Sequence, residues 1–80
     1  MSFHYTYVLK SIKDGELYVG ATSDIKQRLK EHNNGFVEST KSRRPLELVY
    51  FEGCRDKYKA FRREQYFKTG FGRRFLKDRI

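Results

Sequence analysis

The chain has 80 residues, enough for one small domain and too few for two, so we expect a single domain over residues 1–80. Its 18 Lys and Arg outnumber its 10 Asp and Glu, and the net charge of +8 is spread along the chain. This balance favours nucleic acid as a partner, and the alternative is a charge that serves only solubility.

The composition also limits the cellular setting and the kinds of site. Cys54 is the only cysteine, which excludes an intrachain disulfide and a thiolate metal site. We expect Cys54 to be a packing residue near a strand end. No apolar run approaches the roughly 20 residues of a membrane span, and the N-terminus does not resemble a signal peptide. The sequence therefore predicts a soluble, cytoplasmic protein without membrane contact.

The first elements in chain order form a predicted β-hairpin. Residues 3–10 are rich in aromatic and β-branched types, and residues 16–20 continue this pattern. The Asp14-Gly15 dipeptide between them predicts a two-residue turn.

Pairing across such a turn determines which side chains share a face of the sheet. A two-residue turn pairs Tyr18 with Ser11 and Gly20 with Leu9. Side chains alternate along a strand, so Tyr7 and Tyr18 share a face, on which Gly20 leaves space for a ligand or another backbone. The two hydroxyls would nevertheless lie roughly 13 Å apart along the strand unless twist, a bulge or a shift in register brings them together.

A helix is predicted next, running to about Asn34, with Gly35 as its left-handed stop. Its N-terminus follows one of three capping residues. These are Thr22, Ser23 and Asp24. The polar and basic stretch 36–45, which ends in the only proline, is predicted to be a loop.

The second half predicts a third strand over 46–52 and a second helix from Asp56 to a stop at Gly70. Residues 72–80 form a short helix or a frayed tail. The order is β-β-α-β-α-α, which indicates an α+β fold with a small, mostly antiparallel three-stranded sheet flanked by helices.

The first helix directs two polar side chains toward the sheet. Ile25, Leu29, His32 and Phe36 follow the spacing of a core stripe, and Arg28 lies beside it. His32 is then either a hydrogen-bonded residue at the edge of the core or part of a site. Arg28 is either a solvated or capping charge or a binding residue.

The second helix carries a carboxylate in its apolar stripe. Ala60, Phe61, Phe67 and Phe71 mark the stripe, and Glu64 falls inside it. A carboxylate there requires a cation, a metal or a raised pKa. The alternatives are an ion pair with the first helix's arginine or a neighbouring lysine, and a helix rotated so that the carboxylate is exposed.

These residues, taken together, resemble the GIY-YIG nuclease domain. The resemblance rests on Tyr7 within "TYVLKS", Tyr18 of "LYVG" eleven residues later, Arg28, His32 and Glu64. It covers residues 4 to about 76 and is greatest to the small stand-alone members, which are related to the nuclease half of the bacterial excision-repair endonuclease subunit.

The resemblance implies a metal-dependent endonuclease acting on nucleic acid, with DNA favoured and a role in DNA repair or recombination. Glu64 would be the single protein ligand of one Mg²⁺ or Mn²⁺ ion. Tyr7 and Tyr18 would orient and deprotonate the attacking water. Arg28 would bind the phosphate, and His32 would take or relay the proton.

Three features depart from the family pattern. Many larger relatives carry an Asn some distance after the metal-binding Glu, whereas no Asn follows Asn34. Many carry a Lys where this chain has Ala21, and of the first motif only its tyrosine, Tyr7, is retained. The alternative function is therefore a nucleic-acid-binding module with weak or absent cleavage.

Five basic residues outside the motifs are predicted to form a nucleic-acid docking surface beside the pocket. They are Lys41, Arg43, Arg44, Arg73 and Arg74. The alternative is that they are solvated charges.

Overall fold

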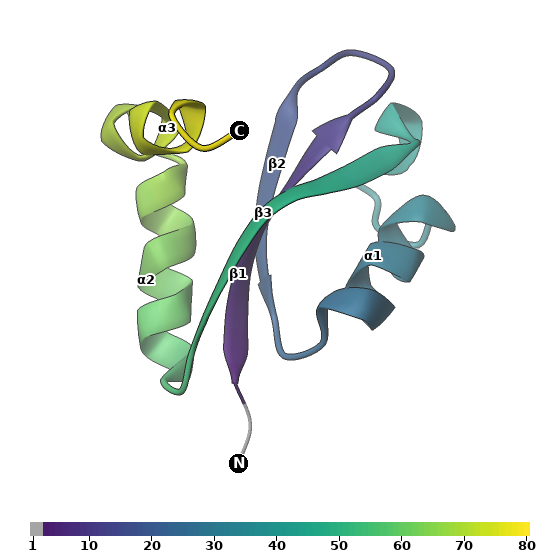
Figure 1. Cartoon of the computed structure of the whole chain (residues 1–80). Helices are drawn as coiled ribbons and strands as arrows, with labels where there is room; N and C mark the ends of the chain where they lie inside the picture. The colour runs from purple at the N-terminus through teal and green to yellow at the C-terminus, as the bar shows by residue number, and fades with distance from the viewer. Residues whose placement is uncertain (1–2) are drawn as a thin grey trace.

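The computed structural model describes residues 3–80, which form a three-stranded antiparallel sheet and three α-helices (Figure 1). The elements are β1 (His4–Ser11), β2 (Leu17–Thr22), α1 (Ile25–Asn33), the 3-10 helix η1 (Lys41–Arg43), β3 (Leu46–Cys54), α2 (Lys57–Phe67) and α3 (Gly70–Lys77). The predicted α+β class and element order are confirmed. None of the helices in this part of the chain has the length and apolar character needed to cross a bilayer.

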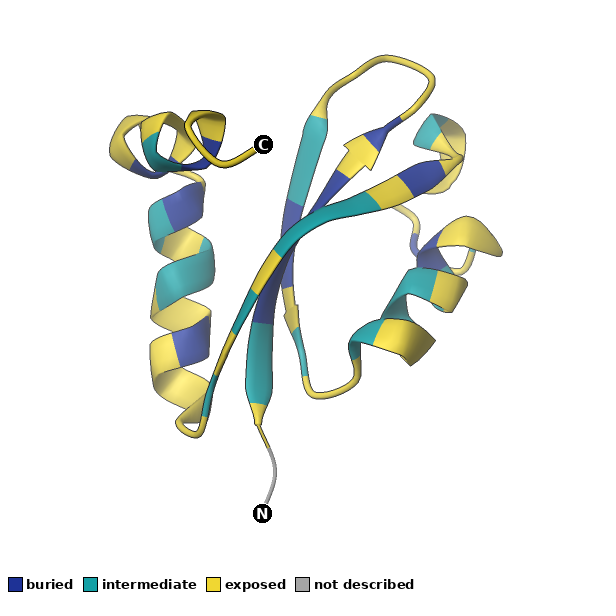
Figure 2. Ribbon diagram, viewed as in Figure 1, coloured by how far each residue is buried: buried dark blue, intermediate teal, exposed yellow. Residues whose placement is uncertain are grey.

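The sheet has the order β2-β1-β3, with helices on both faces (Figure 1). Alternate side chains of β1 enter two cores. Val8 packs with Phe67 and Leu76 beneath α2 and α3, while Leu9 packs with Leu29 on the α1 face. Buried residues accordingly lie along β1 and on the sheet-facing sides of the helices (Figure 2). The central strand is thus shared by both layers.

Local side-chain hydrogen bonds define the helix starts. Asp24 caps α1, because its carboxylate accepts the backbone N–H of Gln27 at 3.1 Å. Asp56 caps α2 in the same way, accepting from Tyr58 and Lys59. Both starts agree with the sequence prediction. The predicted stop of the second helix at Gly70 is wrong, because α2 ends at Phe67 and Gly70 is the first residue of α3.

The predicted two-residue hairpin turn is wrong. The Ser11 backbone N–H donates to the carbonyl of Glu16 at 2.9 Å, so the strands are joined by four residues, 12–15. The Ser11 hydroxyl oxygen accepts the N–H groups of Lys13 and Asp14 at 3.1 and 3.2 Å, which stabilises this longer loop. Gly15 completes it at φ +75°.

Three phenylalanines expected in the helical stripes are exposed. They are Phe36 (77%), Phe61 (54%) and Phe71 (73%). The first lies beyond the end of α1, and the last belongs to α3, whose axis differs from that of α2 (Figure 1). The middle one points outward because α2 turns Ala60 and Phe67 toward the sheet, where the Thr6 hydroxyl donates to the Ala60 carbonyl at 2.9 Å.

Candidate active site

The register of the hairpin brings the two tyrosines together. Tyr7 pairs with Gly20, and Leu9 pairs with Tyr18, so the predicted pairing of Tyr18 with Ser11 is off by two residues. The ring centroids of Tyr7 and Tyr18 are 6.4 Å apart. The space left by Gly20 holds the phenol of Tyr7, which a Cβ at position 20 would overlap, and not a ligand or another backbone. The four-residue loop therefore places Tyr18 opposite Leu9, which halves the separation from Tyr7 along β1 that the two-residue turn predicts.

His32 lies at the centre of the site and is fully buried, as its place in the α1 stripe predicted. Its Nε2 atom is 2.9 Å from the Tyr7 hydroxyl oxygen, and its ring packs edge-on against that of Tyr18 at 5.0 Å between centroids. The Nδ1 atom is 2.7 Å from the hydroxyl oxygen of Thr40. His32 is thus both a hydrogen-bonded core residue and a direct neighbour of the two tyrosines.

Sequence reasoning missed Thr40. It lies in the stretch 36–45, which was predicted to be a loop, yet it is fully buried just before η1. Because the residue belongs to no helix or strand, no periodicity in the sequence marks it as facing inward.

Burial sets the protonation of the central pair. It lowers the pKa of His32 to about 4, helped by the positive charge of Arg28. Burial also raises the pKa of Tyr7, and the neighbouring guanidinium of Arg28 opposes this rise. At neutral pH a neutral phenol therefore lies against a neutral imidazole that can accept a proton.

Arg28 lies beside this pair and remains partly exposed. Its guanidinium donates to the carboxylate of Glu31 at 3.0 Å, one helical turn along α1. The alternative in which Arg28 pairs with the carboxylate of α2 is therefore wrong. A half-exposed guanidinium next to Tyr7 is free to accept a second anion through its remaining donors.

Glu64 lies on α2, with its side chain 16% exposed, and accepts a hydrogen bond from Lys68 at 2.9 Å. The predicted alternative of an ion pair with a neighbouring lysine is thus present. Its negative charge contributes to the raised pKa of Tyr7, so the two groups lie within electrostatic reach. The candidate residues consequently lie in both layers of the fold.

A hollow of about 350 Å³ borders Glu64. It is also lined by His4, Ala21, Thr22, Ser23, Lys57, Ala60 and Phe61. These residues come from the start of β1, the β2–α1 connection and the first turns of α2. Figure 1 places these segments at the lower end of the sheet, away from the hairpin loop.

The donor set at Glu64 fits only a sparsely ligated metal. Residues 3–80 contain no group of three or more His, Cys, Asp or Glu side chains able to hold an ion. One carboxylate at an open hollow suits Mg²⁺ or Mn²⁺, which retain several waters and take further oxygens from phosphate. Lys68 would have to yield its place on the carboxylate.

The five predicted docking residues fall into two groups at the hairpin end of the sheet. Lys41, Arg43 and Arg44 lie in or next to η1, on the α1 side (Figure 1). Arg43 is 3.6 Å from the carboxylate of Asp14, and Arg44 donates to the Lys41 carbonyl at 2.8 Å. Two side chains of this first group therefore already bind other groups of the protein.

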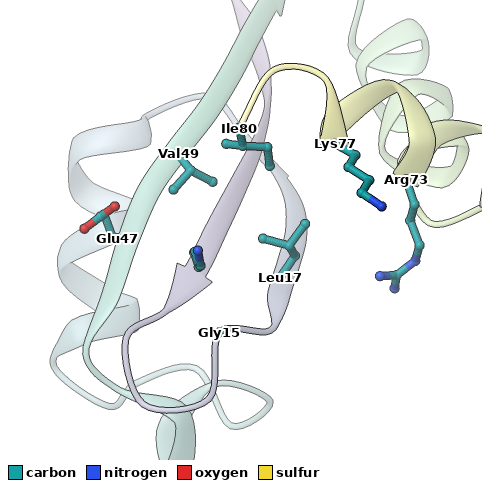
Figure 3. Close-up of a pocket in the computed structure, with 8 residues that line it drawn as sticks. Gly15, Leu17, Glu47, Val49, Arg73, Lys77 and Ile80 are labelled. Carbon is teal, nitrogen blue, oxygen red and sulfur yellow. The ribbon is translucent and has the colours of Figure 1, made fainter.

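The second group lies on α3, across the sheet. The guanidinium of Arg74 lies over the ring of Phe71, 5.9 Å from its centroid. Arg73 and Lys77 border a second hollow, of about 510 Å³, toward which both side chains extend in Figure 3. The apolar residues lining this hollow are Leu17, Val49 and Ile80. The five residues thus form no single surface beside Glu64.

The fold and the cluster of Tyr7, Tyr18, Arg28 and His32 can now be compared with known protein families. The model of the GIY-YIG catalytic domain matches residues 3–77, nearly the whole described chain. The chain belongs to the GIY-YIG family, as its motifs predicted.

Its relatives within that family are UPF0213 proteins. It is 47% identical to the UPF0213 protein SSP2268 of Staphylococcus saprophyticus over 70 residues, which are 86% of this chain and 84% of that protein. It is 44% identical to the UPF0213 protein YazA of Bacillus subtilis over 66 residues, 81% of this chain and 66% of that protein. The solution structure of the UPF0213 protein BH0048 from Bacillus halodurans matches with a TM-score of 0.57 and 33% identity, over 95% of this chain and 83% of that one.

Proposed function

We propose that this protein is a metal-dependent endonuclease that hydrolyses phosphodiester bonds in nucleic acid, with DNA as the favoured substrate. The observation that carries the proposal is the contact of Tyr7 with the buried, neutral His32 at 2.9 Å, in a nuclease-type domain of net charge +8. A phenol alone is a poor base at neutral pH, and an adjacent imidazole supplies the missing acceptor.

Each residue of the cluster has a separate role in the proposed reaction. Tyr7 takes a proton from the attacking water as its own hydroxyl proton passes to His32. Tyr18, whose ring packs on His32, orients that water. Arg28, partly exposed beside Tyr7, binds a non-bridging oxygen of the phosphate.

Glu64 would hold the Mg²⁺ or Mn²⁺ ion. Such an ion supplies polarisation of the phosphate and stabilisation of the leaving oxygen. Glu64 meets the requirement for a hard oxygen ligand next to space for waters and phosphate. Lys68 serves as its counter-ion in the metal-free protein.

The basic residues would position the nucleic acid backbone. Arg73 and Lys77 at the second hollow, Arg74 on the same helix, and the η1 group would contact phosphates without reading sequence. A role in DNA repair or recombination is part of the proposal and rests on the resemblance to the excision-repair nuclease domain.

A second candidate is a nucleic-acid-binding module with little or no cleavage. One observation favours it: Ala21, at the position where many larger relatives carry a lysine, lines the Glu64 hollow. The lysine of those relatives is thus absent at this position, although Lys57 of α2 also lines the hollow.

Cleavage assays separate the two candidates. Branched, flapped, nicked and single-stranded DNA and RNA are incubated with the protein in Mg²⁺, Mn²⁺ or EDTA. We expect metal-dependent scission that Glu64→Gln abolishes and that Glu38→Gln, at an exposed site outside the cluster, leaves unchanged. Binding without scission in any metal would establish the module instead.

A further inference from the structure

Thr40 is a buried polar residue with an unusual set of contacts. Its side chain is fully buried, and its hydroxyl oxygen lies 2.7 Å from His32 Nδ1 and 3.4 Å from the Val37 carbonyl. Its backbone N–H also donates to the Val37 carbonyl at 3.1 Å, and its own carbonyl accepts from Arg43 at 2.9 Å. The hydroxyl is therefore held by its own two contacts and by the hydrogen bonds of the Thr40 backbone.

The donors and acceptors around Tyr7 indicate which way this chain of hydrogen bonds runs. Arg28, beside the phenol, carries only donors. Among residues 3–80, His32 Nε2 is the one acceptor within hydrogen-bond distance of the Tyr7 hydroxyl. A phenol that donates to Nε2 therefore keeps its hydrogen bonded, and the neutral imidazole that accepts it carries its own hydrogen on Nδ1.

The same reasoning extends to Thr40. Nδ1–H donates to the threonine oxygen, and the threonine hydroxyl donates to the Val37 carbonyl, which has two lone pairs for its two donors. Every hydrogen in this series of hydrogen bonds then has an acceptor. This agrees with the absence of unpartnered buried side-chain polar atoms among the described residues. The opposite direction leaves the Tyr7 hydrogen without one.

We propose that Thr40 is a positioning residue that holds neutral His32 in the Nδ1–H tautomer, so that the Nε2 lone pair faces the Tyr7 hydroxyl. The catalytic consequence rests on the proposed nuclease function, whereas the tautomer does not. Thr40 touches no reacting atom and acts only through His32.

The catalytic step balances with these groups. The water oxygen bonds to phosphorus, and the bond to the 3′ oxygen breaks. The water proton moves to the Tyr7 oxygen as the phenolic proton moves to His32 Nε2. The leaving oxygen takes a proton from solvent, to which the imidazolium later returns its own. During the step, Thr40 accepts from Nδ1–H throughout, so it also stabilises the imidazolium.

The first test is nitrogen-15 NMR of the His32 ring, which needs neither metal nor substrate. We expect Nδ1 protonated and Nε2 unprotonated at pH 7 in the parent protein and in Thr40→Ser, which keeps the hydroxyl. Thr40→Val keeps the shape and removes the hydroxyl, so the Nε2–H form should become populated. An Nε2–H tautomer in the parent protein would overturn the proposal, whether or not the protein cleaves nucleic acid.

The second test is kinetic and applies once cleavage is established. Thr40→Val should lower kcat by roughly 10- to 100-fold, by analogy with the partners that orient metal-ligating histidines, with KM nearly unchanged. Thr40→Ser should restore most of the rate. Parental tautomer and parental kcat in Thr40→Val would contradict the role. If that variant does not fold, the parent and serine spectra still decide the tautomer.

Discussion

At the scale of single residues, the site depends on two aromatic side chains with different surroundings. The Tyr7 hydroxyl bonds to a buried imidazole, whereas the Tyr18 hydroxyl has no hydrogen-bond partner among residues 3–80. Tyr7 and Tyr18 lie in similar sequence motifs, but only the Tyr7 hydroxyl contributes a hydrogen bond within the described part of the folded protein. The two phenylalanine variants should therefore behave differently.

Tyr7→Phe should lower the free energy of unfolding by about 1–2 kcal/mol, because His32 Nε2 is left buried without a partner. Tyr18→Phe should leave it nearly unchanged. Both should reduce cleavage, Tyr7→Phe by the ~10²–10⁴-fold typical of general-base groups. Urea unfolding and single-turnover kinetics measure the two effects. Equal stability of the variants would contradict the hydrogen bond, and parental rates would remove both hydroxyls from the chemistry.

His32 also makes stability depend on pH. Its pKa falls from 6.5 to about 4 on folding, so between these values the unfolded chain binds a proton that the folded protein does not. The free energy of unfolding should therefore decrease by up to about 3 kcal/mol as the pH falls from 6.5 to 4. Arg28 strengthens this effect, and Glu31 weakens it.

Urea unfolding at pH 7 and 4.5 checks this prediction when the unfolding free energies of the parent protein and of His32→Gln are compared. Carboxylates with lowered pKa values, such as those of Asp14 and Glu31, lose stabilisation in both proteins and largely cancel in the comparison. The variant should show a smaller loss on acidification. A His32 resonance that titrates near pH 6.5 in the parent protein would contradict the cause.

At the scale of elements, the β1–β2 pair and α2 position the candidate catalytic groups. The register sets Tyr7 opposite a residue without a side chain, and the phenol crosses Gly20 to reach His32. On α2, one helical turn separates Glu64 from the lysine that neutralises it. Each arrangement makes a distinct prediction.

Gly20→Ala should displace the Tyr7 phenol, because the added methyl overlaps it and Tyr7 is too closely packed to move freely. We expect a loss of about 1–3 kcal/mol in unfolding free energy and loss of the Tyr7–His32 contact. Thermal melting and the shift of the His32 ring nitrogens measure both. Gly70→Ala, at a site with open space for the methyl, is the control. Parental melting of Gly20→Ala would refute the register.

Lys68→Ala should strengthen metal binding, because the amino group competes with a cation for the Glu64 carboxylate. The pair joins neighbouring turns of one helix and is partly exposed, so its loss should cost only about 0.3–0.5 kcal/mol. Glu64→Gln should cost as little, since its partner is a lysine and not a buried arginine. Metal titration of the cleavage rate measures the effect, with Lys59→Ala as control. A higher metal requirement in Lys68→Ala would count against Glu64 as the ligand.

At the scale of the whole molecule, the basic groups lie at the hairpin end of the sheet, while the Glu64 hollow lies at the other end (Figure 1). A bound nucleic acid that contacts both must run along the length of the sheet. Its affinity should come from phosphate contacts and should fall with salt.

Charge reversal at Arg73 and Arg74 should weaken binding equally on all sequences and reduce the salt slope by about 0.9 for each lost phosphate contact. Reversal at Arg43 and Arg44 should weaken it as well, but less, because these side chains already bond within the fold. Fluorescence anisotropy across a salt series measures the slope. An unchanged slope in the α3 variant would remove this helix from the interface.

The sequence by itself determined the features that depend on neighbouring residues. Capping carboxylates and the glycine at φ +80° after α1 are local signals, so the order of elements, the starts of α1 and α2 and the end of α1 follow from them. Helical spacing likewise predicted that His32 faces the sheet, and motif spacing indicated the family.

Only the tertiary structure decided which side chains meet. The hydroxyl of Ser11 supports a four-residue loop, and this choice moves the register by two and sets Tyr7 over Gly20. Thr40 reaches His32 because the segment that follows α1 folds back toward this helix. The contacts of Tyr7 with Gly20 and His32 join residues of different elements, and their energies depend on packing between those elements, which no local pattern encodes.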